Sequence, residues 1–122
     1  MEIFLLLGIL NGFLAVALGA FGAHGLEGKL SEKMLATWEK AVQYQMFHTV
    51  ALLATGLLMS KITSGSIVSA GWFFFAGIIL FSGSLYIYST TQIKTFVMIT
   101  PIGGLAFLVG WVLLGYAVIK YI

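Results

Sequence analysis

The sequence has very little charge, a single proline, no cysteine and no arginine. Charged residues make up 8% of its 122 residues and hydrophobic residues 61%, whereas about a quarter of a typical soluble domain is charged. The lack of cysteine excludes disulfides, iron–sulfur clusters and thiolate metal sites within the chain. The few lysines are too sparse for a nucleic-acid footprint, so we predict no nucleic-acid partner. The composition indicates an integral membrane protein.

Four long apolar stretches stand in place of the missing charge. They cover about residues 3–23, 42–60, 67–89 and 95–119, and each approaches the roughly 20 residues with which a helix crosses the hydrocarbon core. Runs such as Trp72–Phe81 are apolar on every side, unlike the alternating strands of a membrane barrel. We therefore predict an all-α integral membrane protein, an antiparallel four-helix bundle that forms one transmembrane domain over residues 1–122.

The second helix is predicted to be longer than its membrane span. Ser31 is a good N-cap residue, and no proline interrupts the chain from Glu32 to Ser60. Such a helix would be roughly 43 Å long, more than the hydrocarbon core needs. Its first turns are therefore expected to protrude or to lie in the interface, with Trp38, Lys40 and Tyr44 as interfacial anchors.

Small residues recur every three or four positions along the predicted helices. Such spacing lets the backbones of neighbouring helices approach closely, but it does not show which helices meet. The predicted packing residues are Gly8, Gly12, Ala15, Gly19, Gly22, Gly77, Gly103 and Gly110. The fourth helix has two alternative starts: it begins at Pro101 with Thr100 as its cap, or it begins near Lys94 and kinks at the proline.

The lysines are divided unequally between the two predicted sides of the membrane. The first and third loops and their flanks carry Lys29, Lys33, Lys40 and Lys94, whereas the other side carries Lys61 and Lys120. Because lysine favours the cytoplasmic side, we predict that the first and third loops are cytoplasmic and that both termini lie outside.

Only seven side chains offer candidate chemistry within or near the spans: Asn11, His24, Glu27, Glu39, Gln43, Gln45 and His48. Asn11 is expected to form a hydrogen bond across a helix interface. Gln45 and His48 share one face of the second helix with Ala41, Leu52 and Thr55. An ionisable residue within a membrane suggests function, and the alternative is a neutral histidine bonded to another helix.

The two histidines raise the question of a metal site. His24 and His48 could approach each other and, with Glu27 or Glu39, supply two imidazoles and one carboxylate. However, the spacing matches no compact ligand motif. We therefore predict no metal or other cofactor and no catalytic residue, and these two histidines are the residues to which a metal hypothesis would apply.

Four segments resemble the signature of a known family: residues 19–26, 38–48, 81–86 and 100–104. The family comprises small four-span membrane proteins, including the bacterial YwdK and YgdD types and a small eukaryotic relative. The resemblance covers essentially the whole chain, and the sequence is similar to Firmicute members of the family. It implies a multi-pass protein of the bacterial plasma membrane, of unknown function, without an established catalytic residue to carry over.

The loop topology places the polar and aromatic positions of these motifs near the face of the first and third loops. The predicted pocket consists of His24, Trp38, Tyr44, Gln45, His48, Ser82, Tyr86 and Pro101. The predicted function is non-enzymatic binding of a lipid, a small solute or a partner membrane subunit, with membrane lipids and a protein partner or second copy as expected partners. One alternative is an oligomeric channel or transporter that uses His48 and Gln45. The other is a membrane enzyme that uses both histidines and a glutamate.

Overall fold

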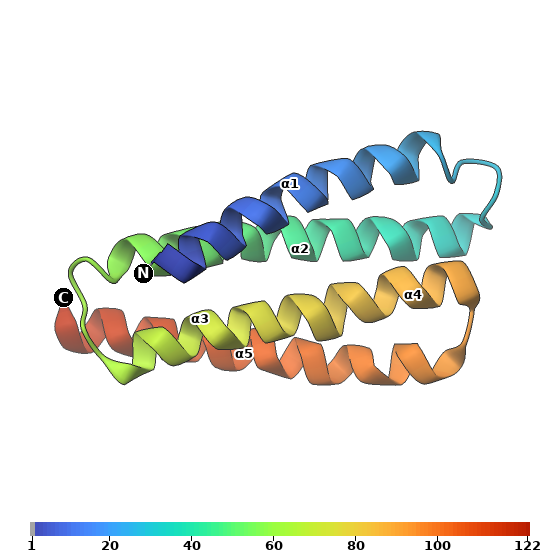
Figure 1. Cartoon of the computed structure of the whole chain (residues 1–122). Helices are drawn as coiled ribbons and strands as arrows, with labels where there is room; N and C mark the ends of the chain where they lie inside the picture. Colours follow the sequence, from blue (N-terminus) through green and yellow to red (C-terminus); the bar gives the residue numbers. More distant parts are fainter. Residues whose placement is uncertain (1) are drawn as a thin grey trace.

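The protein folds as four long helical rods joined by short loops (Figure 1). The computed structural model describes residues 2–122. The elements are α1 (Glu2–His24), α2 (Glu32–Leu58), α3 (Gly65–Gly77), the π-helix η1 (Ile78–Gly83), α4 (Ser84–Thr91) and α5 (Lys94–Tyr121). The third rod is the continuous run of α3, η1 and α4. The all-α prediction is confirmed, since residues 2–122 contain no strand.

Three of the four rods are long and apolar enough to cross a membrane: α1, the rod of residues 65–91, and α5. Helix α2 is not among them: glutamates and lysines occupy its first turns, and its apolar part contains two glutamines and a histidine. It nevertheless packs along α1 on one side and along α3, η1 and α4 on the other. The fourth span remains a prediction, which this position within the bundle favours.

Successive rods run in opposite directions (Figure 1). The loops that follow α1 and α4 lie at one end of the bundle, and both termini lie with the α2–α3 loop at the other end. This topology separates the lysines as the sequence predicts, with four toward one end and two toward the other. Which end faces the cytoplasm remains a prediction.

The small residues of α1 form the contact with α2. A Cβ atom added at Gly12 or Gly19 would lie 3.3 Å from a side-chain carbon of Thr49 or Val42, respectively. At Gly22 the same atom would lie 2.5 Å from the indole ring of Trp38. The glycine spacing of α1 therefore permits a close approach to α2: a side chain at Gly22 would require the indole of Trp38 to move, and one at Gly12 or Gly19 would tighten the contact.

Helices α3 and α5 meet through two reciprocal phenylalanine contacts. The ring of Phe107 on α5 covers Gly77, and the ring of Phe74 on α3 covers Gly110, where an added Cβ atom would lie 2.8 Å from the ring. Both phenylalanines are buried in the core cluster of the bundle. Each helix thus supplies a ring and a glycine to the other, which fixes their relative register.

The helix ends resolve two questions that the sequence raised. Ser31 caps α2, because its side chain accepts a hydrogen bond from the backbone N–H of Met34 at 3.2 Å. Helix α5 begins at Lys94 and continues through Pro101, so the second of the two predicted starts is correct. Its N-cap residue, Ile93, forms no side-chain cap.

Trp38 is not the interfacial anchor that the sequence suggested. Its side chain is only 5% exposed, and its indole Nε1 donates a hydrogen bond of 2.9 Å to the backbone oxygen of Leu18. The absence of a side chain at Gly22 leaves the space that the indole ring occupies. Tyr44 and Lys40 are exposed, as an anchor residue must be.

The π-helix η1 was not predicted. Ser82, within η1, donates a hydrogen bond of 2.7 Å to the backbone oxygen of Ala41 on α2. Ser84, just after it, lies 2.6 Å from the hydroxyl oxygen of Thr100 on α5. Short π segments often occur at functional sites, and this one is tied by hydroxyl groups to the two helices that flank it.

Gln92, after α4, has a backbone φ of 59° and therefore adopts the left-handed conformation. Because a Cβ atom is disfavoured there, we expect Gln92→Gly to raise the free energy of unfolding by about 1 kcal/mol. Thermal denaturation in detergent would measure this as a higher Tm. The matched control is Gly28→Ala, at φ 80°, which should lower Tm; equal effects of the two substitutions would contradict the interpretation.

Candidate functional site: a polar network and a lateral groove

A chain of hydrogen bonds centred on Gln45 links three helices. The Nε2 group of Gln45 donates to Oδ1 of Asn11 at 2.9 Å, and the hydroxyl of Tyr86 donates to Oε1 of Gln45 at 2.7 Å. Asn11 in turn donates to the backbone oxygen of Leu7 at 2.8 Å. The prediction that Asn11 bonds across a helix interface is confirmed. Helices α1, α2 and α4 are joined at this level.

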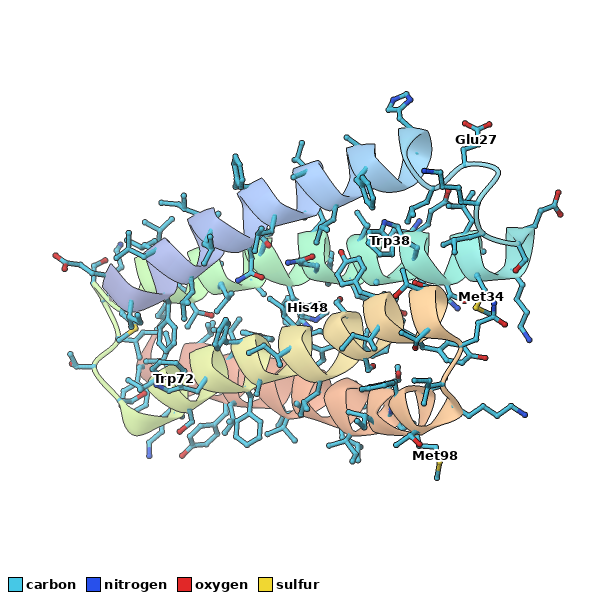
Figure 2. All side chains as sticks on the ribbon, turned by 45° about the vertical axis from the view of Figure 1, so that its right-hand side comes forward. Glu27, Met34, Trp38, His48, Trp72 and Met98 are labelled. Atoms are coloured by element: carbon cyan, nitrogen blue, oxygen red, sulfur yellow. The ribbon has the colours of Figure 1, made fainter. Side chains whose placement is uncertain are left out.

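Trp38 extends this network toward the α1–α2 loop. Its ring meets the ring of Tyr86 edge to face, with 4.7 Å between the ring centroids, and Figure 2 shows its side chain inside the bundle. Among residues 2–122, no buried side-chain nitrogen or oxygen atom lacks a hydrogen-bond partner. The network is therefore closed on itself, and its chemistry favours holding helices together over binding a ligand.

His48 lies about three turns from Trp38 on a different side of α2, within the bundle (Figure 2). Its Nδ1 is 2.9 Å from the backbone oxygen of Tyr44, and its Nε2 is 3.0 Å from Nε1 of Trp111. Because an indole N–H only donates, Nε2 of His48 must accept, and the proton must therefore reside on Nδ1. The ring also stacks on Phe107, with 3.5 Å between centroids. This geometry favours the neutral, helix-bridging histidine.

An open groove with a volume of about 950 Å³ runs beside His48, between α2 and α5. Its lining consists of Gln43, Tyr44, Phe47, His48, Phe81, Pro101, Gly104, Leu105, Phe107, Leu108 and Trp111. Most of these side chains are aromatic or aliphatic. The walls reach the outer surface of the bundle, since Phe47 and Leu108 are 60% and 63% exposed. In a membrane, this groove would open sideways into the lipid.

The structure divides the predicted pocket residues into two groups. Trp38, Gln45, Ser82 and Tyr86 belong to the closed polar region between α1, α2, η1 and α4. Tyr44, His48 and Pro101 line the groove. The prediction of one polar pocket at the end of the bundle therefore has to be corrected. Helix α2 presents two faces, one toward α1 and α4 and the other toward α5.

His24 belongs to neither group and does not meet His48. It is the exposed last residue of α1, whereas His48 is sixteen positions into α2, roughly 24 Å along the helix axis. Glu27 points away from the bundle in the α1–α2 loop (Figure 2). Within residues 2–122, no three histidine, cysteine or carboxylate side chains gather as a metal site would require. The approach of the two histidines, which the sequence left open, does not occur.

Seven groove residues were not among the predicted site residues: Phe47, Phe81, Gly104, Leu105, Phe107, Leu108 and Trp111. Their apolar character is the same as that of lipid-facing residues, so hydropathy carries no signal for them. One signal was available for Trp111. A neutral histidine inside a membrane needs a donor for its second ring nitrogen, and only a few side chains on the last helix can supply one.

Comparison with known proteins places the chain in a recognised group. Residues 18–104 match the family model described as "Protein of unknown function (DUF423)". The UPF0382 membrane protein YwdK of Bacillus subtilis is 51% identical over 123 residues, with all of both chains covered. A UPF0382 membrane protein of Staphylococcus aureus is 54% identical over 121 residues, covering 99% of this chain and 98% of the relative. No solved structure gives a significant match. The chain belongs to the DUF423 family of bacterial membrane proteins.

Proposed function

We propose that the protein is a non-enzymatic membrane protein that binds the hydrocarbon chain of a lipid in the groove between α2 and α5. The observation that carries the proposal is the groove itself. Its volume of about 950 Å³ falls within the range of ligand sites, and its apolar walls open on the side of the bundle that faces lipid. Because the groove opens into lipid and its walls are apolar, a hydrocarbon chain is the ligand that it favours.

The groove walls are held in place before a ligand arrives. The ring of Tyr44 lies 4.4 Å from that of Phe81 between centroids, and the His48 ring is fixed by Phe107 and Trp111. Rigid aromatic walls lose little conformational freedom on binding, which favours affinity. The ring nitrogens of His48 are bonded to the protein, so the walls offer mainly apolar surface.

The same hydrogen bonds argue against the channel hypothesis. Both ends of the Gln45 amide are bonded, to Asn11 and to Tyr86, and both ring nitrogens of His48 are bonded. A path that used these groups to carry a solute would have to break contacts that join helices. The groove also runs along the side of the bundle, between only two of its rods and the π-helix behind them.

Filling the groove should remove the bound lipid. An added Cβ atom at Gly104 would have only one neighbour, a ring carbon of Phe81 at 3.9 Å, so the indole of Gly104→Trp can occupy the groove. We expect the lipid retained per protein, measured by mass spectrometry after detergent purification, to fall about fivefold or more, which corresponds to ~1 kcal/mol of binding free energy.

The matched control is Gly115→Trp, on the same helix. Gly115 is exposed, and an added Cβ atom there would meet no heavy atom within 4 Å. It lies outside the groove lining, so the retained lipid should match that of the unmodified protein. Equal lipid content in the two tryptophan variants would refute the proposed function.

A further inference from the structure

We infer that the groove selects a lipid with an anionic phosphate headgroup, which Lys33, Lys40 and Lys94 hold at the end of the groove toward the α1–α2 and α4–α5 loops. This inference rests on the proposed function and adds the class of lipid. It is carried by the position of these three lysines on α2 and α5 relative to the groove.

On α2, the lysines continue the stripe of residues that forms the groove wall. Lys33, Lys40 and Phe47 are spaced seven residues apart, which places them within about 40° of one another around a helix axis. Phe47 lines the groove, and both lysines are exposed. Helical side chains lean toward the N-terminus of their helix, which here means toward the surface of the membrane.

On α5, Lys94 has the same relation to the opposite wall. Lys94, Pro101 and Leu108 are also seven residues apart, and the latter two line the groove. The first turn of α5 contains no acidic residue and no side-chain cap. A lysine at this position adds to the positive end of the helix dipole, so an anion between the two helices would relieve an unfavourable arrangement.

The carboxylates nearby do not lie at the centre of this stripe. Glu32 and Glu39 each precede a lysine by one residue, which places them about 100° around the helix from it. Glu27 belongs to the α1–α2 loop, where Lys29 accompanies it. The positions that extend the two groove walls toward the loops therefore carry three lysines, and the carboxylates of α2 lie to the side of them.

The depth of the lysines also suits a lipid. Contacts of His48 with Trp111 and Phe107 set the relative level of α2 and α5. At 1.5 Å per residue, Lys40 is about 12 Å and Lys94 about 26 Å above that level. Half of a bilayer's hydrocarbon core is about 15 Å thick. Lys33, fifteen residues before His48, lies about 22 Å above the same level and therefore close to the level of Lys94. A phosphate between Lys33 and Lys94, which the Lys40 side chain reaches from below, would place its acyl chain alongside Tyr44 and down to Trp111.

The test compares two charge-matched double variants. Lys40→Gln with Lys94→Gln removes two cations at the groove, and Lys61→Gln with Lys120→Gln removes two at the opposite end of the bundle. Each purified protein is incubated with equal amounts of phosphatidylglycerol and phosphatidylcholine that carry identical acyl chains. Native mass spectrometry then counts the lipids bound. All four lysines are exposed, so folding should be preserved.

We expect the unmodified protein to prefer phosphatidylglycerol by roughly a hundredfold, because three lysines each contribute about a fivefold effect near an anionic lipid. The preference should fall to about fivefold in the Lys40/Lys94 variant, which keeps only Lys33 at this end of the groove. The Lys61/Lys120 variant should keep the full preference. The inference is overturned if the unmodified protein binds both lipids equally, or if the two double variants lose the preference to the same extent.

The Gly104→Trp variant separates the two levels of the argument. If it loses both lipids while the unmodified protein shows no headgroup preference, the groove binds lipid chains and only the headgroup inference fails. If it retains both lipids in full, the groove is not the binding site, and the proposed function fails together with the inference.

Discussion

Replacing Gly103 with alanine should lower the free energy of unfolding by about 2–3 kcal/mol, an overpacking effect at the upper end of the usual range. Gly103 faces the backbone of η1. An added Cβ atom would lie 2.7 Å from the carbonyl carbon of Leu80 and 2.8 Å from the Cα atom of Phe81, and it would collide with the backbone nitrogen of Phe81. Because these are backbone atoms, no rotamer change can relieve the clash, and α5 must move away from η1.

Gly115→Ala provides the control on the same helix. No heavy atom within 4 Å would meet the added methyl group, and alanine is the better helix former by about 1 kcal/mol. The control should therefore be neutral or stabilising, whereas Gly103→Ala should lower Tm strongly in detergent. If both variants melt at the same temperature, the close approach of α5 to the π-helix does not exist as described.

The second large effect is expected at Gln45. Gln45→Leu would leave the amide oxygen of Asn11 and the hydroxyl of Tyr86 without their present partners. Breaking two buried hydrogen bonds should destabilise the protein by about 1–3 kcal/mol, since each is worth ~0.6–1.7 kcal/mol inside a membrane. Gln43→Leu, an exposed neighbour at the groove, should change the stability little.

A double-mutant cycle shows whether the network is the cause. In a Tyr86→Phe background one of the two bonds is already absent, so Gln45→Leu should cost measurably less than in the unmodified protein. Strict additivity of the two substitutions in chemical denaturation would argue that Tyr86 and Gln45 do not interact. A cost at Gln43 as large as that at Gln45 would also contradict the account.

The parts of the fold that follow from local chemistry were accessible from the sequence. Glycines spaced three or four residues apart on α1 predicted a close helix contact, and α1 packs on α2 through these positions. Ser31 was predicted as a cap and acts as one. The five residues assigned to one face of α2 are all buried. In each case the signal is a helical period or a hydrogen-bond requirement, and neither depends on the solvent.

The arrangement of the site could not be predicted in the same way. In lipid, the outer surface and the core are both apolar, so hydropathy did not separate the buried Trp38 from an interfacial anchor or the groove residue Leu105 from a core residue. The π-helix η1 has no proline or charge to mark it. The sequence also left open whether His24 and His48 meet, because the end of α1 lies near the start of α2. His48 lies sixteen residues beyond the start of α2, far from the end of the bundle at which His24 lies.

The most direct test of the groove uses the fluorescence of Trp111 in membranes. Trp38→Phe with Trp72→Phe leaves Trp111, on the groove wall, as the only tryptophan. A matched protein that keeps only Trp72, which is exposed outside the groove lining, serves as the reference.

Both proteins are reconstituted into membranes with a small, increasing fraction of phosphatidylglycerol that is brominated on its acyl chains. Lipid bound in the groove should quench the fluorescence of Trp111 much more than the fraction of brominated lipid in the membrane accounts for. The quenching of Trp72 should follow that fraction. Identical quenching of the two tryptophans would contradict the account.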